Sequence, residues 1–298
     1  MKKQILFLSI LQCLLIYHAK AEVIASGDNC GDNCHWEYDD TTKTLTITGT
    51  GNINNYPKEE NPSYNPNETT SSKWRTTAPW GIYSKEVQNI NITSGITSLG
   101  EGVFRGMDQV TSVNLPNGLE TIGTSAFDTA LSLQNINIPQ SVSSIGSRAF
   151  ASTVNLESLA IPNSVVSIGT NAFNVNEELY GTSSTKSIVL GNGMETIGSG
   201  AFTGMSDDLT IFCPEHGNHG NKSCQQTLQK TGFKGQILSY SQIANNLYSV
   251  SQNGKTSYYS SLAKMAKNIE MKRIYTIDEA NKVSGKKNTF KIRYKEQG

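Results

Sequence analysis

Short runs of alternating apolar and polar residues recur through residues 87–202, always in the same register. Five copies of an eighteen-residue pattern are present: VQNINITSGITSLGEGVF, VTSVNLPNGLETIGTSAF, LQNINIPQSVSSIGSRAF, LESLAIPNSVVSIGTNAF and TKSIVLGNGMETIGSGAF. Within each copy, Ile, Leu or Val fill every second position of a short stretch, which predicts a strand with one apolar face. Because such a strand cannot bury that face alone, the copies are expected to stack in a continuous array.

A regular spacing of glycines sets the period of the array. Gly100, Gly123, Gly146 and Gly169 are each 23 residues apart, whereas the step to Gly198 is 29 residues. A period in the twenties is typical of a solenoid. The longer step comes from six extra residues in the run VNEELYGTSS, which are expected to bulge at a corner because a longer strand would break the stack.

A phenylalanine ends each copy, and the five together are expected to form the second wall of the core. Each Phe follows a Gly by four residues, which predicts a tight corner that leads into a single helical or 3₁₀ turn. The column consists of Phe104, Phe127, Phe150, Phe173 and Phe202.

The pattern IxIPxxVxSIGxxAF resembles the BspA-type leucine-rich repeats of secreted and surface proteins in host-associated microbes. The resemblance covers residues 87–202, and the stretches TLTITGTGNINNY and APW before them resemble the usual entry to such arrays. It implies a mainly β solenoid, an array of short parallel strands with brief helical or 3₁₀ turns. It also implies a binding or adhesion module that is not catalytic.

Residues 22–86 precede the array and are expected to cap its open end. Trp36 and Tyr38 alternate with charged neighbours, and the run TLTI then alternates Thr with Leu and Ile, which predicts a β-hairpin. Such a hairpin covers strand edges that would otherwise invite aggregation.

An inserted loop is predicted within this cap at residues 57–77, which are polar and contain three prolines. Its residues Tyr64, Trp74 and Arg75 are of the types enriched at binding hot spots. The loop is therefore either a binding element or a tolerated insertion.

The array, residues 87–233, is expected to close on a truncated sixth strand in DLTIFCP and a helix-like segment in SCQQTLQKTGF. From residue 234 the register is lost. Residues 234–298 are predicted to be a linker, with one helix over residues 260–271, followed by a small basic α+β unit.

The formal net charge of zero hides an uneven distribution. Residues 264–298 hold ten basic and four acidic residues, whereas residues 22–262 hold twelve basic and twenty-one acidic ones. An acidic body is not expected to bind nucleic acid through phosphate contacts. The basic end is expected to contact something anionic, either the body itself, a cell surface or a polymer.

Residues 1–21 have the features of a secretory signal peptide. Two lysines precede the apolar run ILFLSILQCLLIY, and small residues at the end predict cleavage after Ala21. A lipoprotein signal at Cys13 is the alternative, but Gln12 stands where a small residue is required. The run is too short to span a bilayer. The mature chain is therefore expected to be secreted or at the cell surface, with no transmembrane segment.

Four cysteines remain after cleavage and fall in two local pairs, Cys30 with Cys34 and Cys213 with Cys224. In an oxidising compartment each pair is predicted to form a disulfide that closes one cap. A metal site is the alternative for the second pair, since CPEHGNHGNKSC gives Cys213, His216, His219 and Cys224 ligand-like spacing. The histidines lie among Gly and Asn as in an ordinary surface loop, which favours the disulfide. His35 has no visible partner and is expected to be exposed.

No catalytic constellation is found in the sequence. It has no GxSxG or HExxH motif, and Gly254-Lys255-Thr256 resembles the end of a P-loop without its first Gly, whose place Ser249 takes. The chain is expected not to be an enzyme and to need no cofactor. The alternative is a secreted accessory protein or enzyme whose activity lies in residues 234–298, with the repeats as a targeting arm.

Polar columns on the predicted strands form the candidate binding face. Outward positions of the first strand read Asn91, Asn114, Asn137, Ala160 and Val189, and the second strand carries the column Ser98, Thr121, Ser144, Ser167 and Thr196. Such columns on a rigid sheet suit an extended extracellular partner, protein or glycan. They could instead only solvate the sheet, with Ser and Thr present for their β propensity. Adhesion is the predicted function, and a structural envelope protein is a further alternative.

Overall fold

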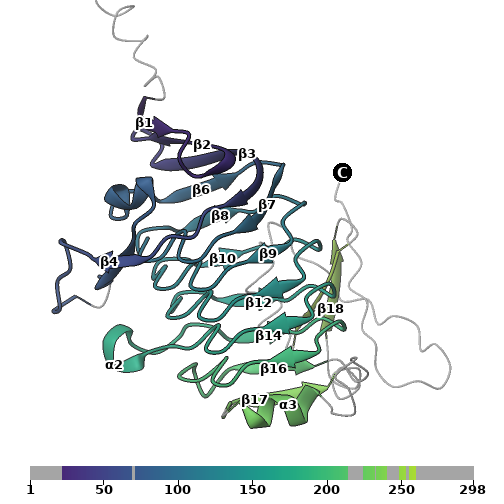
Figure 1. Ribbon diagram of the computed structural model, residues 1–298. Helices are drawn as coiled ribbons and strands as arrows, with labels where there is room; N and C mark the ends of the chain where they lie inside the picture. The colour runs from purple at the N-terminus through teal and green to yellow at the C-terminus, as the bar shows by residue number, and fades with distance from the viewer. Residues whose placement is uncertain are drawn as a thin grey trace, which may run out of the picture.

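The computed structural model describes residues 22–68, 71–213, 224–231, 233–239, 248–252 and 255–259. Short strands stack on one another, with β1 and β2 at one end and α3 at the other (Figure 1). The predicted signal peptide, the helix over residues 260–271 and the basic C-terminal unit lie outside the described residues and stay predictions.

The first strand of each copy builds a parallel ladder that starts from β3 (Thr44–Ile53). β6 (Asn89–Ile92), β8 (Ser112–Asn114) and β10 (Asn135–Ile136) follow in order. A four-stranded parallel sheet continues the stack with β12 (Ser158–Ala160), β14 (Ser187–Val189), β16 (Thr210–Cys213) and β17 (Gln236–Ser239). The predicted sixth strand is therefore confirmed as β16.

The second strand of each copy builds another parallel ladder from the same β3. Its members are β7 (Ile96–Leu99), β9 (Thr121–Ile122), β11 (Ser144–Ile145), β13 (Ser167–Ile168) and β15 (Thr196–Ile197). Equivalent positions of the copies pair with one another, as when Ile145 lies between Ile122 and Ile168. The predicted solenoid of short parallel strands and its register are confirmed.

The corner after each second strand contains the predicted single turn, with bonds from residue i+3 to residue i such as Ala126 nitrogen to the Gly123 carbonyl at 3.3 Å and Asp128 nitrogen to the Ser125 carbonyl at 3.2 Å. Between these bonds, other backbone N–H groups of the corners bond to the next copy, as from Phe127 to the Ala149 carbonyl at 2.7 Å and from Phe150 to the Ala172 carbonyl at 2.7 Å. These N–H groups point toward the next copy because the residue two positions after each regularly spaced glycine has a left-handed backbone, as Ser125 does with φ of 54°. The corners therefore stack as a third hydrogen-bonded wall.

Close approach between copies, not a left-handed backbone, explains the glycine column. A Cβ on Gly123 would lie 2.4 Å from the Leu99 carbonyl oxygen, and one on Gly146 would lie 2.5 Å from the Thr124 nitrogen. Both distances are too short for any side chain. The column keeps neighbouring copies at strand spacing.

The phenylalanine column forms a buried wall, as predicted. All five rings are 2% exposed or less, and successive centroids lie 5.2 to 5.5 Å apart. The column continues beyond the repeats, through Trp80 at the N-terminal end and Phe233 at the C-terminal end. Both caps therefore share the aromatic core of the array.

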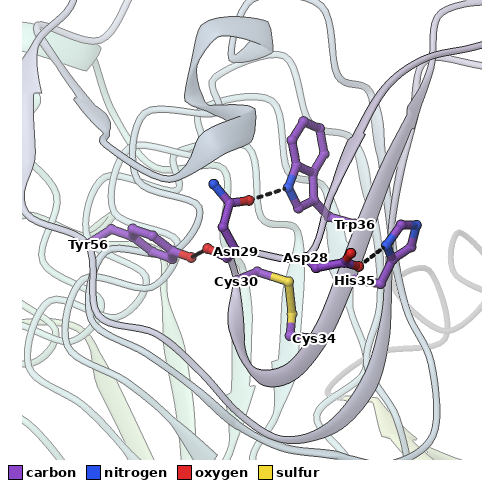
Figure 2. Close-up of a disulfide and its surroundings, with 7 residues drawn as sticks. All are labelled: Asp28, Asn29, Cys30, Cys34, His35, Trp36 and Tyr56. Atoms are coloured by element: carbon purple, nitrogen blue, oxygen red, sulfur yellow. Dashed lines mark hydrogen bonds and ion pairs between the residues drawn. A yellow bond between two sulfur atoms is a disulfide. The ribbon is translucent and has the colours of Figure 1, made fainter.

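The N-terminal cap is an antiparallel sheet of β1 (Val23–Gly27), β2 (Gly31–Asp39) and β3, which contains the predicted hairpin. The predicted Cys30–Cys34 disulfide closes the turn between β1 and β2. Figure 2 shows Asn29 beside it, where its side chain accepts from Trp36 Nε1 at 3.0 Å and its carbonyl from the Tyr56 hydroxyl at 3.3 Å. The turn is thereby fixed to the aromatic end of the core.

His35 has two partners that the sequence did not reveal. Its Nδ1 lies 2.5 Å from Asp28 Oδ1 (Figure 2). Its Nε2 lies 3.2 Å from Glu37 Oε1. The hydrogen bond to Asp28, followed by that to Glu37, raises the pKa of His35 above its ordinary value of 6.5. Because the pKa of His35 is higher in the folded chain than in the unfolded chain, the protonated ring stabilises the fold below pH 6.5. This contribution to the free energy of unfolding is lost as pH rises through the folded pKa.

We expect an NMR titration to place the His35 pKa above 6.5 in the folded chain and closer to 6.5 in an Asp28→Asn variant. The variant removes the carboxylate that favours the imidazolium. The unsubstituted chain, unfolded in urea, gives the reference pKa of His35 in the unfolded state. Identical folded pKa values in the two proteins would show that Asp28 does not hold the ring.

The insertion at residues 57–77 is not a plain loop, which corrects the prediction. β4 (Lys58–Glu60) and β5 (Trp74–Thr76) pair antiparallel, and η1 (Pro79–Tyr83) follows. The second insertion holds α2 (Glu177–Tyr180), where the Asn176 side chain accepts from the Leu179 nitrogen as an N-cap. β4 and α2 project from the same side of the stack (Figure 1).

The stack continues past residue 233, where the sequence predicted a linker. β17 pairs in parallel with β16, and α3 (Cys224–Lys230) packs against β15 and β17. β18 (Tyr248–Gln252) and β19 (Lys255–Tyr259) form an antiparallel hairpin. β17 was missed because its run of QILS is too short to show the repeat pattern.

Candidate binding surfaces

The outward side of the first ladder is an uncharged surface, which we term the amide face. Alternation along the strands buries Ile90, Val113 and Ile136 and turns the residues between them outward. Ten side chains make up the face: Asn89, Asn91, Ser112, Asn114, Asn135, Asn137, Ser158, Ala160, Ser187 and Val189. All ten are exposed or half-buried. Within it, Asn114 Nδ2 donates to Asn91 Oδ1 at 2.9 Å.

The hydroxyl column lies on the second ladder and is less accessible. Its first four members, Ser98 to Ser167, are half-buried, and Thr196 is exposed. Ser98 Oγ and Thr121 Oγ1 lie 2.5 Å apart, so they satisfy each other. The structure therefore places the two predicted columns on separate ladders, and these hydrogen bonds run within a column.

Of the three candidate hot spots in the hairpin, Trp74 alone is substantially exposed. It is 38% exposed, with the Lys58 and Lys73 ammonium groups 4.5 and 5.5 Å from its ring centroid. Arg75 is occupied within the chain, because its Nε bonds Glu59 Oε1 at 2.7 Å and its Nη1 lies 3.4 Å from the Gly81 carbonyl. Tyr64 is half-buried.

A buried polar cluster fastens the hairpin to the repeats. Asp108 is fully buried, and its Oδ2 accepts from Lys85 Nζ at 2.5 Å and from the Ser72 backbone nitrogen at 3.0 Å. Ser72 Oγ in turn lies 2.8 Å from Thr129 Oγ1. The sequence offered only a weak signal for this cluster, an acidic residue four positions after Phe104, because Glu177 stands at the same distance after Phe173.

Two arginines surround a second buried carboxylate beside this cluster. Asp128 accepts from Arg148 Nε at 3.2 Å and Nη2 at 3.1 Å, and lies 3.8 Å from Arg105 Nε. Burial raises the pKa of Asp128, whereas both arginines oppose that rise. Arg105 Nε is buried without a hydrogen-bond partner among the described residues, and burial lowers the pKa of Arg105.

The two insertions meet at this point. Burial raises the pKa of the α2 phenol Tyr180, and nearby Asp128 adds to the rise, whereas a hydrogen bond with Ser72 of the hairpin opposes it. Segments more than a hundred residues apart thus share one polar cluster. This contact between the insertions could not be read from the repeat pattern.

Cys213, one of the four candidate metal ligands in the closing cap, cannot bind a metal ion as a thiolate. Cys213 is disulfide-bonded, and a disulfide sulfur offers no thiolate to a metal. His216 and His219 lie outside the described residues. In the part of the chain that the structure describes, no group of three His, Cys, Asp or Glu side chains is placed to hold a metal ion.

We expect mass mapping of a non-reduced digest to pair Cys213 with Cys224. The two residues are eleven positions apart, and a disulfide there would join β16 to the start of α3. The Cys30–Cys34 peptide provides an internal control in the same digest. A Cys213 peptide joined to Cys30 or Cys34 would contradict this pairing.

Comparison with known families settles the relationship of the chain. A family model described as BspA type Leucine rich repeat region matches residues 82–180 and 174–276 in six copies, more than half of the chain. The chain belongs to this family. The resemblance seen in the repeat pattern is thereby confirmed, and the BspA-type repeats extend beyond the five copies recognised in the sequence. No curated protein matches the chain.

Solved structures of leucine-rich repeat proteins from bacteria align with the BspA-type chain. A leucine-rich cell surface protein from Faecalibacterium prausnitzii is 21% identical with a TM-score of 0.43, covering 79% of this chain and 61% of that one. The T. pallidum leucine-rich repeat protein is 19% identical with a TM-score of 0.40, covering 67% and 94% respectively. The pneumococcal vaccine antigen PcpA is 19% identical with a TM-score of 0.40, covering 54% and 38%.

No helix in the described ranges has the length and apolar character that crossing a membrane requires.

Proposed function

We propose that the chain is a secreted or cell-surface interaction protein without enzymatic activity, which binds an extended extracellular partner through the amide face. The observation that carries the proposal is the regular array of outward polar side chains on a hydrogen-bonded ladder. Its family is associated with such roles, and the leader-like residues 1–21 support export.

Rigidity favours binding by this face. The backbone of each strand is held by its neighbours, and the side chains are short, so little conformational entropy remains to be lost when a partner binds. An extended partner can contact several copies at once, and each copy adds a modest contribution. A shallow face of this kind suits adhesion better than catalysis, which requires groups that converge on one reacting atom.

We expect an Asn114→Arg variant of the full chain to lose most binding to immobilised extracellular matrix and to bacterial cell walls, by about tenfold or more. A long charged side chain at the centre of the face would both obstruct the partner and introduce an unpaired charge. Surface plasmon resonance or a sedimentation assay would measure the change.

Ser144→Arg on the second ladder is the matched control, and we expect its binding to remain within about twofold of the original chain. Equal losses in the two variants, at equal stability in urea, would contradict the assignment of the amide face.

A further inference from the structure

The amide face has an unusual chemical composition for a protein-binding surface. Its ten side chains are five Asn, three Ser, one Ala and one Val, with no charged, aromatic, Met or Arg residue among them. Protein interfaces obtain most of their affinity from buried Trp, Tyr and Arg anchors, which this face lacks. The composition therefore disfavours a protein partner.

The absence of charge also limits the class of ligand. An acidic partner would find no cation on the amide face to offset the loss of its hydration, and a basic one would find no carboxylate. Elsewhere on the cap charge is common, as at Asp28 and Glu37. A neutral ligand is the one that this face can desolvate at low cost.

Free hydrogen-bonding groups remain on the face. Among the described residues, the side chains of Asn135 and Asn137 make no hydrogen bond, and both are exposed. Each amide offers two donors and an acceptor oxygen with two lone pairs. Sugar hydroxyls both donate and accept, so one amide can serve two of them.

Parallel pairing repeats these groups along the stack. Asn135 lies beside Ser112 across the β8–β10 pair, and Ser112 lies beside Asn89 across the β6–β8 pair. The neighbouring strands are spaced by about 4.8 Å. A chain of repeating sugar units laid across the strands would meet one equivalent polar position after another.

We infer that the amide face binds a neutral polysaccharide, laid along the stack across the strands, through hydrogen bonds to Asn135, Asn137 and their equivalents. This inference rests on the proposed function and narrows its partner to one class. Binding arises from many weak neutral contacts, so multivalent engagement supplies the affinity. Since no ion pairs take part, salt has little effect on it.

The test uses the full chain with insoluble cellulose and with affinity electrophoresis in gels containing neutral mannan or amylose, and heparin and polygalacturonate as charged comparisons. We expect retention by at least one neutral polysaccharide, unchanged in about 1 M salt, where ionic contacts are screened. Binding only to the charged polymers, or retention by none of the neutral ones, would overturn the inference.

A double variant, Asn135→Ala with Asn137→Ala, removes the two free amides without adding bulk. We expect its retention on the bound polysaccharide to fall by about tenfold, the loss expected for two hydrogen bonds. Asn117→Ala with Gln140→Ala is the matched control, because both are exposed amides outside the strands, and its retention should stay within about twofold. Both variants are compared at equal unfolding midpoints in urea.

The outcomes separate this inference from the function it rests on. If Asn114→Arg abolishes binding to matrix while every neutral polysaccharide is ignored, the interaction function stands and the partner is a protein. If neutral polysaccharide is retained equally by the alanine double variant, the sugar does not lie on the amide face and the inference is wrong.

Discussion

Phe150→Ala is expected to lower the free energy of unfolding by about 3 to 5 kcal/mol, the loss typical of a buried phenylalanine. Phe150 is fully buried, and its ring centroid lies 5.3 Å from that of Phe127 and 5.2 Å from that of Phe173. Removing the ring leaves a cavity in the middle of the column. The neighbouring copies cannot collapse into it, because their strands and corners are hydrogen-bonded on both sides.

Urea unfolding followed by circular dichroism would measure this loss. Asn137→Ala is the control, because its side chain is exposed and makes no hydrogen bond in the described structure, so we expect a change within about 0.5 kcal/mol. Similar losses in the two variants would mean that the Phe column does not carry the core.

Asp108→Ala is expected to lower the free energy of unfolding by about 3 kcal/mol. Removing one partner of a buried ion pair leaves the other charge uncompensated, at a cost of about 3 to 5 kcal/mol. We expect the lower end of this range because Lys85 keeps 29% of its side chain exposed and can regain water. The Ser72 backbone nitrogen would also lose its acceptor.

Asp208→Ala provides the comparison for this second variant. Asp208 pairs with Lys186 at 3.9 Å, and both side chains are more than half exposed, so its loss should be within about 0.5 kcal/mol. Limited proteolysis gives a second measurement, since release of the hairpin should speed cleavage within residues 57–77 in Asp108→Ala alone. Equal cleavage rates would show that Asp108 does not fasten the hairpin.

The repeating part of the fold could be predicted because five copies show the same pattern of apolar and polar positions. Alternating positions such as Ile136 and Leu159, and the phenylalanines that end each copy, fix strands, register and core without reference to distant residues. The single turn at each corner was predicted, whereas the hydrogen bonds between the corners of successive copies were not. A left-handed residue such as Arg148 has no sequence signature, and its backbone bonds depend on the neighbouring copy.

The positions of the two insertions were predicted, but their internal structure and contacts could not be, because each insertion occurs once. The β4–β5 hairpin is stabilised by contacts with Asp108 and Thr129, which lie 36 and 57 positions from Ser72. Long-range contacts of this type leave no local periodicity. The outward columns were identified because alternation defines which side of a strand faces solvent. The sequence did not separate the free amide of Asn137 from the paired Asn91 and Asn114, and it did not identify Asn135.

The meeting of the two insertions has a mechanical consequence. In a simple solenoid each copy touches only its neighbours, so the stack can be peeled from one end a copy at a time. Here the hairpin entering before the first copy bonds to Thr129 after the second, and Ser72 also meets Tyr180 after the fourth. Under tension along the chain, the contacts of Ser72 with Thr129 and Tyr180 would have to break before those copies could unfold one by one. A protein anchored at one end and loaded at the other would therefore be expected to yield in a single event across this region.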